Sequence, residues 1–321
     1  MKQRRLLVLG TGGTIAGRST VAGDNVGYRA GEVSVDDLLT PLQAHLSLLD
    51  GWTVEAVQVA QLDSKDMDET TWMALARSVH TAVTDPTVGA VLITHGTDTL
   101  EETAYFLSRV VPADKPVVLT CAMRPASALC PDGPQNLLDA LAVAVSDEAQ
   151  GVWVVAAGRI HAPDRVTKVH PYQVDAFSSG EAGVVGWVEE AQVRWSGDQP
   201  RVSRTCVPLA KLDPPWPRVE VVFSHGGASA SMLASLVDAA PTGAADAVQG
   251  LVVAGTGNGT IHQAWMPGLT RAMVRGVTVW RTTRCTAGSV VEGAGAAIPA
   301  VALPPFKARL ELVLHLAQQR P

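Results

Sequence analysis

Short continuous apolar runs alternate along the chain with longer segments of helical periodicity. The runs, each four or five residues long and rich in Val, Leu or Ile, are Leu6–Leu9, Ala90–Thr94, Val117–Cys121, Val152–Ala156, Val219–Phe223, Leu251–Ala254 and Val277–Arg281. The segments that predict amphipathic helices are Val35–Leu49, Thr71–Val83, Leu100–Val111, Pro134–Ala149, Ser229–Ala239, Ile261–Arg275 and Pro305–Gln319. Continuous apolar strands are typical of a sheet covered on both faces. The pattern therefore predicts an α/β protein with a mainly parallel sheet flanked by helices.

One segment shows neither period. Residues 194–218 contain five prolines among polar residues, which is typical of a linker. We therefore expect a larger N-terminal catalytic α/β domain over residues 1–193 and a smaller C-terminal α/β domain over residues 219–321.

The composition excludes several classes of protein. Hydrophobic residues make up 47% of the 321 residues and charged residues 17%, the reverse of a disordered chain. A net charge of −6 disfavours a nucleic-acid binder, and no apolar run reaches the roughly 18 residues that a membrane span needs. The four cysteines are far apart, and Gly10 interrupts the apolar stretch that follows the basic start. These features predict a cytoplasmic protein with reduced thiols.

A glycine-rich turn, Gly10–Gly17, follows the first predicted strand. Such a turn lets the backbone approach a ligand closely. The third glycine of a dinucleotide-binding fingerprint would fall at Ile15, and the chain has no Gly-Lys pair for a P-loop, so neither nucleotide motif fits. Thr14 distinguishes this turn by placing a hydroxyl among the glycines, although a lone threonine there is usually a turn or helix-capping residue.

A second polar turn, Thr94–Glu102, follows the second predicted strand at the end where ligands bind in α/β sheets. Thr99 and Glu102 fit a capping box, and Asp98 suits the positive end of a helix dipole. Thr97 adds a polar side chain that capping does not need. His95 is interpreted as a structural residue, because no second histidine lies at metal-ligand spacing.

Lys168 follows the fourth predicted strand. A lone lysine is usually a solvated surface charge, but beside a hydroxyl a desolvated amine can act as a base. Thr97, Lys168 and Asp98 would then form a nucleophile, base and orienting set, by the logic of the serine triad. The chain has no GxSxG or HExxH motif and no Cys/His cluster, so serine-elbow and metal-dependent hydrolysis are disfavoured.

Two segments, Thr11–Gly17 and Thr94–Thr99, together resemble the signature segments of bacterial-type L-asparaginases and glutaminase-asparaginases. Further segments agree in order over nearly the whole chain: Asp63–Met67, Ala122–Pro125, Asp132–Asn136, Val166–Lys168 and Gly255–Gly259. The resemblance implies hydrolysis of L-asparagine to L-aspartate and ammonia, without a cofactor, through a covalent β-aspartyl enzyme.

The resemblance also implies roles for particular residues. Thr14 would be the primary nucleophile, assisted by Tyr28, and Thr97, Lys168 and Asp98 would form a second set that serves deacylation. The segment from Gly17 to Gly31, which carries the tyrosine, is expected to act as a flexible lid.

Further residues would bind the substrate. Ser64 and Asp98 would hold its α-carboxylate and α-ammonium groups. Lys65 stands where many relatives carry Gln, and it is expected to pair with the substrate carboxylate or with Asp98. Asn258 and Glu292 would reach into a neighbouring subunit of a homotetramer arranged as a dimer of dimers.

Other functions are left open. One methylene in a substrate changes binding by only about 1 to 3 kcal/mol, so a glutaminase-asparaginase of broad amide specificity is one alternative. An amidase subunit serving a tRNA-dependent amidotransferase would usually carry an additional RNA-binding domain. A Rossmann-like oxidoreductase using Gly10–Gly17 belongs to another class, and the glycine spacing disfavours it.

Overall fold

The computed structural model describes residues 4–21, 23–41, 49–112, 114–197, 206–241, 243–244, 246–293 and 295–320. The chain divides into two compact units, Met1–Leu209 and Ala210–Pro321. The residue limits that the sequence predicts for the domains stay predictions. Residues 198–205 of the predicted linker, and residues 42–48 of the first predicted helix, lie outside the described residues.

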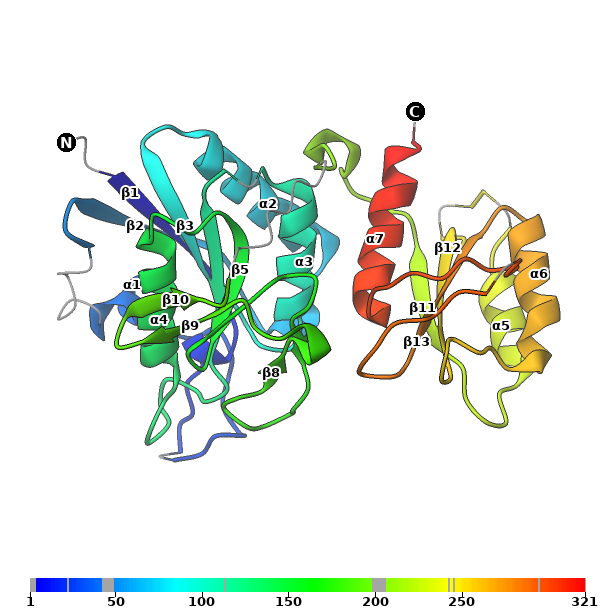
Figure 1. The fold of residues 1–321 in the computed structure, drawn as a ribbon, viewed down its shortest axis with the longest axis horizontal. Coiled ribbons are helices and arrows are strands. Elements are labelled where there is room, and N and C mark those ends of the chain that lie inside the picture. Colours follow the sequence, from blue (N-terminus) through cyan, green and yellow to red (C-terminus); the bar gives the residue numbers. More distant parts are fainter. Residues whose placement is uncertain are drawn as a thin grey trace. The chain divides into compact units, whose positions relative to one another are not determined.

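An eight-stranded sheet forms the centre of the N-terminal unit, with strand order β10-β9-β6-β5-β4-β3-β1-β2 (Figure 1). Its strands are β1 (Arg4–Gly12), β2 (Trp52–Leu62), β3 (Val88–Thr94), β4 (Pro116–Thr120), β5 (Gly151–Ala156), β6 (Arg159–His161), β9 (Gly186–Glu189) and β10 (Gln192–Trp195). Strands β1 to β5 are parallel, and β6, β9 and β10 add antiparallel pairs at one side. The short strands β7 (Thr167–Lys168) and β8 (Phe177–Ser178) form a separate ribbon. The mainly parallel sheet is thus confirmed.

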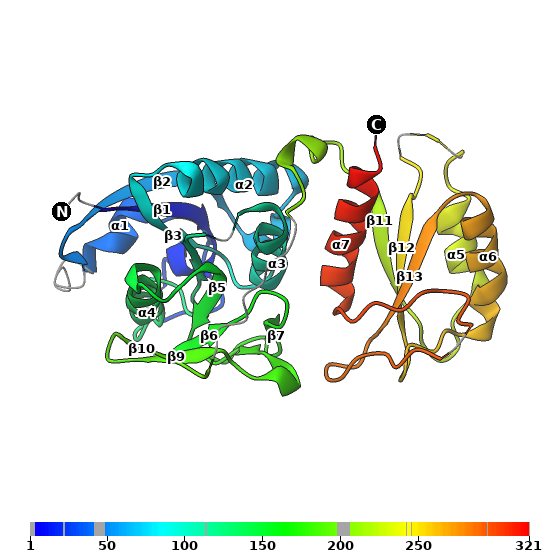
Figure 2. The same ribbon diagram turned by 45° about the horizontal axis from the view of Figure 1, so that its top comes forward.

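Helices cover both faces of this sheet. They are α1 (Val35–Leu39), α2 (Glu69–Thr84), α3 (Leu100–Val110) and α4 (Gly133–Val145). Figure 2 shows α2 and α3 on one face and α1 and α4 on the other. Leu6, Leu92 and Leu137 lie in the core cluster that the α4 face shares with the sheet. Burial on two faces explains why the central strands are continuous apolar runs.

Strand register brings distant turns together at the carboxyl ends of the strands. In β1, Gly10 is opposite Thr94 of β3, and Gly12 is opposite Leu62 of β2. The turns that follow these three strands therefore start next to one another, at the place where open α/β sheets bind ligands.

The C-terminal unit is a smaller α/β domain. Its three-stranded parallel sheet has the order β11 (Val219–Phe223), β12 (Gly250–Gly255), β13 (Thr278–Thr283). Helices α5 (Ala230–Val237) and α6 (Met266–Val274) lie on one face and α7 (Pro305–Gln318) on the other (Figure 1). Trp265 and Leu269 are fully buried in its core. In neither unit does a described helix have the length and apolarity needed to cross a bilayer.

Some elements differ from the prediction. The helix expected over residues 35–49 is described only as Val35–Leu39, and β2 and the antiparallel strands β6, β9 and β10 were not predicted. Trp195 and the residue before it, which the sequence assigns to the linker, close strand β10.

Candidate active site

Two glycines in backbone contact join the turns after β1 and β3. A Cβ atom built on Gly13 would lie 2.2 Å from the Cα of Gly96, and one built on Gly96 would lie 2.5 Å from Ser64 Oγ. Gly13 also has a φ of +79°, a conformation that favours glycine. Because Thr14 and Thr97 each follow one of these glycines, the two predicted threonines start from touching turns.

The hydroxyl of Thr14 pairs with that of Tyr28. Thr14 is buried in the short 3-10 helix η1 (Thr14–Ala16), and its Oγ1 lies 2.6 Å from the Tyr28 hydroxyl oxygen. Burial raises the pKa of Tyr28, and the charges of Asp63 and Asp98 add to the increase, although the bond to Thr14 opposes it. The phenol is therefore protonated at neutral pH.

The segment that carries Tyr28 is tied at its base and at its tip. Arg18 and Arg29 exchange backbone hydrogen bonds of 3.0 and 2.9 Å. At the tip, Asp24 accepts the backbone N–H groups of Val26 and Gly27. These bonds hold the described residues of the segment in a turn whose Tyr28 contacts Thr14, and the motion of the segment as a lid stays a prediction.

Lys168, in β7, gathers the second set of side chains. Its Nζ donates to Thr97 Oγ1 at 2.8 Å and forms an ion pair with Asp98 Oδ1 at 2.5 Å. The Lys168 side chain is 16% exposed and that of Asp98 is 52% exposed, so the amine is largely withdrawn from water while the carboxylate is open to a ligand. The structure thus brings together Thr97, Lys168 and Asp98.

Sequence reasoning missed Glu101, which holds the backbone of Lys168. Glu101 is buried in the first turn of α3, and its Oε2 accepts the Lys168 backbone N–H at 2.5 Å. An acidic residue in a first helical turn is ordinarily explained by the helix dipole, so the sequence carries no signal for this longer-range contact.

The predicted capping box at the start of α3 is wrong. Thr99 occupies the N-cap position without a side-chain cap, and its hydroxyl instead donates to the Ser64 backbone oxygen at 2.8 Å. Ser64 Oγ in turn accepts the backbone N–H of Asp98 at 3.1 Å. The two bonds fasten the Ser64 turn to the turn that carries Asp98.

Within the protein, Lys65 pairs with carboxylates other than Asp98, the partner that the sequence suggested. Its Nζ lies 2.9 Å from Asp66 Oδ2 and 3.0 Å from Asp63 Oδ2. Hydrogen bonds to Asp66 and then to Asp63 raise the pKa of Lys65, so the amine is charged. Asp98 instead forms an ion pair with Lys168. A contact of Lys65 with substrate stays a prediction.

Asn258 and Glu292, in the C-terminal unit, are joined through Val291. The Asn258 side chain donates to Val291 O at 2.9 Å and accepts from Val291 N at 2.7 Å. Glu292 Oε1 accepts the Ala300 backbone N–H at 3.0 Å. Within this chain, Asn258 therefore braces the loop that carries Glu292, and their action in another subunit stays a prediction.

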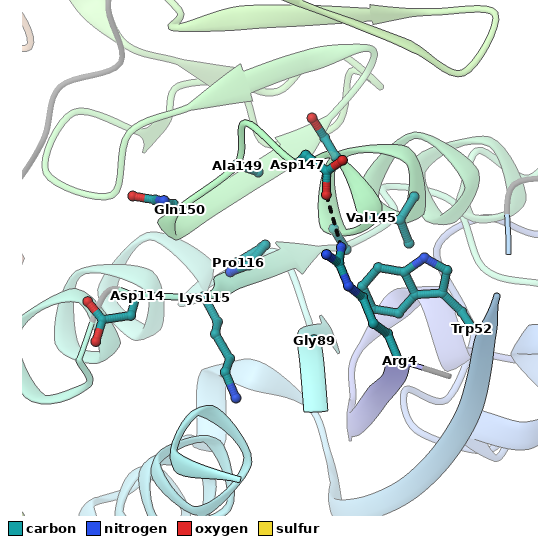
Figure 3. Close-up of a pocket in the computed structure, with 12 residues that line it drawn as sticks. Arg4, Trp52, Gly89, Asp114, Lys115, Pro116, Val145, Asp147, Ala149 and Gln150 are labelled. Carbon is teal, nitrogen blue, oxygen red and sulfur yellow. Dashed lines mark hydrogen bonds and ion pairs between the residues drawn. The ribbon is translucent and has the colours of Figure 1, made fainter. Parts of the chain in front are cut away.

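A separate hollow of about 200 Å³ lies at the amino ends of the parallel strands (Figure 3). Arg4 extends over Trp52 and pairs with Asp147 at 2.9 Å, and Lys115 Nζ donates to the Asp85 backbone oxygen. None of the predicted site residues lines this hollow.

Metal-ligating side chains do not gather in the described part of the chain. No group of three or more His, Cys, Asp or Glu residues there is placed to hold an ion. The four cysteines are free thiols. The groups gathered at the carboxyl ends of the strands are hydroxyls, an amine and carboxylates.

Known proteins resemble the chain over both units. A family model described as "Asparaginase, N-terminal" matches residues 5–201, and one described as "Glutaminase/Asparaginase C-terminal domain" matches residues 218–321. L-asparaginase 2 of Bacillus subtilis is 35% identical over 97% of this chain and 82% of its own length. Glutaminase-asparaginase of Acinetobacter glutaminasificans is 34% identical over 98% and 96%. The crystal structure of a probable cytoplasmic L-asparaginase from Campylobacter jejuni has a TM-score of 0.89 at 33% identity, covering 98% of this chain and 95% of that one.

Proposed function

The chain belongs to the asparaginase family, and on that premise we propose that it is an L-asparagine amidohydrolase that forms L-aspartate and ammonia. The observation that carries the proposal is the contact of Gly13 with Gly96, from which the Thr14 and Thr97 hydroxyls start. A carboxamide is stabilised by resonance, so its cleavage needs an activated hydroxyl, donors for the oxyanion and a proton for the leaving ammonia.

Acylation uses the first pair of hydroxyls. Thr14 Oγ1 attacks the side-chain carbonyl carbon of asparagine, and its proton passes to the Tyr28 oxygen. The protonated phenol of Tyr28 gives its own proton to the departing nitrogen, which leaves as ammonia. A β-aspartyl ester on Thr14 results. The 2.6 Å separation of the two oxygens supports this relay, because proton transfer needs hydrogen-bond reach.

Deacylation uses the second set. A water molecule attacks the ester carbonyl while Thr97 Oγ1 takes its proton and passes one on to the neutral amine form of Lys168. The ion pair with Asp98 holds the Lys168 ammonium group that forms when the amine accepts this proton. When the bond between the acyl carbon and Thr14 Oγ1 breaks, the proton held by Lys168 returns through the Thr97 hydroxyl to Thr14 Oγ1. This restores the Thr14 hydroxyl and the neutral amine, and L-aspartate leaves.

Two side chains are suited to the α-substituents of the substrate. Ser64 Oγ accepts the Asp98 backbone N–H, so its own proton is available to the α-carboxylate. The Asp98 carboxylate is 52% exposed and can also accept the α-ammonium. An amino acid with both groups is therefore favoured over a simple amide.

The assembly proposed is a homotetramer, a dimer of dimers in which Asn258 and Glu292 complete a neighbouring subunit's site. We place the enzyme in the cytoplasm, the compartment named for the similar Campylobacter jejuni protein. Light scattering on a sizing column tests the tetramer, and cell fractionation tests the compartment. A monomer with full activity would refute the shared site.

Ammonia release from L-asparagine and L-glutamine, measured side by side, tests the function. The purified protein should turn over asparagine without added metal or nucleotide, and a chelator should not inhibit it. We expect kcat/KM for asparagine to exceed that for glutamine by about 10-fold or more. Equal values would favour the second candidate, a glutaminase-asparaginase, which the name of the Acinetobacter relative supports. Release only in the presence of NAD would overturn both.

A further inference from the structure

His95 is a fully buried titratable side chain that the proposed reaction does not use. It lies between the end of β3 and the start of α3 with 0% of its surface exposed. Its Nδ1 is 2.7 Å from the Gly96 oxygen, and its Nε2 is 3.0 Å from Thr103 Oγ1 in α3. Trp72 Nε1, in α2, donates to the same Thr103 hydroxyl at 2.9 Å. A chain of three hydrogen bonds thus runs from α2 through α3 to the turn that precedes Thr97.

Chemistry fixes the direction of every bond in this chain. A carbonyl oxygen can only accept, so His95 Nδ1 carries a hydrogen and donates to Gly96. Burial lowers the pKa of His95 to about 4, so the ring is neutral near pH 7 and its Nε2 carries no proton. The Thr103 hydroxyl must therefore donate to Nε2, while the indole of Trp72 donates to the Thr103 oxygen. The tautomer of His95 follows from its neighbours.

The bond to His95 sets the orientation of the next peptide group. In a trans peptide the C=O and N–H bonds point in opposite directions, so the Thr97 N–H points away from the ring that holds the Gly96 carbonyl. Among the described residues this N–H has no acceptor, whereas the following one, of Asp98, is taken by Ser64 Oγ. A donor without a protein acceptor thus lies beside the Thr97 hydroxyl and is available to a ligand.

Gly96 cannot hold this orientation by itself. A side chain there would collide with Ser64, since a Cβ would lie 2.5 Å from Ser64 Oγ, so the position requires glycine. Glycine is also the residue with the greatest backbone freedom. The carbonyl contact with His95 supplies a restraint that Gly96 lacks.

We propose that His95 is a positioning residue, which acts through Gly96 to hold the Thr97 N–H toward the oxygen of the scissile amide. The inference rests on the proposed function. The ring neither touches the substrate nor changes its charge in the reaction. A donor already aimed at the place where negative charge develops lowers the barrier of the chemical step. Loss of this restraint should therefore reduce kcat and leave KM nearly unchanged.

Substitutions that separate donor from shape test the proposal. His95→Leu removes the donor to Gly96, whereas His95→Asn keeps an amide N–H near the position of Nδ1. Thr103→Val removes the hydroxyl that orients the ring and keeps a side chain of similar shape. We expect His95→Leu to lower kcat about 10- to 100-fold with KM within about threefold, His95→Asn to recover part of the loss, and Thr103→Val to lower kcat less.

His225 supplies a matched control. Its Nδ1 also lies 2.8 Å from the oxygen of the glycine that follows it, but the residue is exposed in the C-terminal unit. His225→Leu should leave kcat unchanged. Wild-type kcat in His95→Leu, a rise in KM alone, or equal losses in the Leu and Asn variants would overturn the proposal. Melting curves identify a variant that fails to fold, and Thr103→Val then decides.

The tautomer gives a readout independent of activity. Nitrogen NMR on protein with ¹⁵N-labelled histidine should show His95 protonated at Nδ1 and bare at Nε2 from about pH 6 to 8, without titrating. A ring that titrates in this range, or that carries its proton on Nε2, would contradict the proposed chain of hydrogen bonds from Trp72 to Gly96. The absence of ammonia release by the wild type would instead refute the proposed function, so the two failures are distinguishable.

Discussion

The eight-stranded sheet carries an ion pair at both ends of its parallel strands, Lys168 with Asp98 at the carboxyl ends and Arg4 with Asp147 at the amino ends. The Lys168 side chain is 16% exposed and also donates to a buried hydroxyl, that of Thr97. Arg4 is 60% exposed, Asp147 is 85% exposed, and their pair borders a polar hollow. Exposed ion pairs contribute about 0 to 1 kcal/mol to the stability of a protein, because water screens their charges. Charged side chains around a hollow therefore do not make it an active site unless reactive groups also come together there, away from water.

Removing the amine at each end of the strands should give the largest contrast. Lys168→Met should lower kcat for asparagine by about 10³-fold or more, because the proton acceptor for Thr97 is lost. Lys115→Met, at the amino ends, should stay within about twofold of wild type. Steady-state ammonia assays, with circular dichroism as a check of folding, measure both. A Lys168→Met enzyme within about tenfold of wild type would remove the distinction between the two ends.

The burial of His95 predicts that stability depends on pH. Its pKa is about 4 in the folded protein and about 6.5 in an unfolded chain, so the unfolded state binds the proton first as the pH falls. The contribution of the neutral His95 ring to the free energy of unfolding is therefore fully present above about pH 6.5. It is lost as the pH falls toward 4, which lowers the free energy of unfolding by up to about 3 kcal/mol.

Urea unfolding of the wild type and of His95→Asn across this pH range measures that effect. The variant should lose this part of the pH dependence, whereas His225→Asn should keep it. Parallel pH curves for the wild type and His95→Asn would contradict the burial of a neutral ring.

Tyr28→Phe should lower kcat less than Lys168→Met does. The substitution keeps the ring that packs near Gly17 and removes only the hydroxyl 2.6 Å from Thr14. We expect kcat to fall about 100-fold, since one proton-transfer group is lost. Tyr172→Phe, at an exposed tyrosine, is the control and should have no effect. An unchanged kcat in Tyr28→Phe would exclude the tyrosine from the relay.

The smallest effect is expected at Lys65. Two carboxylates, Asp63 and Asp66, hold its amine, and the side chain is 60% exposed. Lys65→Gln should therefore change the KM for asparagine by no more than about threefold, with kcat unchanged. A larger rise in KM would mean that the amine leaves its acidic neighbours to bind the α-carboxylate of the substrate.

The parts of the fold that could be predicted are those buried on two faces. Strands β3, β4 and β5 lie in the middle of the sheet, and their apolar runs mark them within one or two residues. Strand β2 was missed because it is at the edge of the sheet, where exposed positions carry polar residues such as Glu55 and Gln58. Short antiparallel strands such as β6 depend on partners far along the chain, which a local pattern does not reveal.

The same limit applies to the site. Thr14 and Thr97 directly follow the buried strands β1 and β3, and Lys168 comes after β5 and β6 in the short strand β7, so motif and position together pointed to them. The role of Glu101 could not be predicted, because its contact with the Lys168 backbone exists only in the folded chain. The partners of Lys65 are its sequence neighbours Asp63 and Asp66, which the expected pairing with Asp98 or the substrate did not consider. The capping box at Thr99 failed for the same reason, since the Ser64 carbonyl competes for its hydroxyl.

Trapping the ester tests most directly whether both hydroxyls act on a single amide. Thr97→Val keeps the shape of the side chain and removes the hydroxyl assigned to deacylation. Mass spectrometry of this variant after mixing with L-asparagine should show an aspartyl adduct on the peptide that contains Thr14, and the double variant with Thr14→Ala should show none. An unmodified Thr97→Val protein, or an adduct on another residue, would contradict the account.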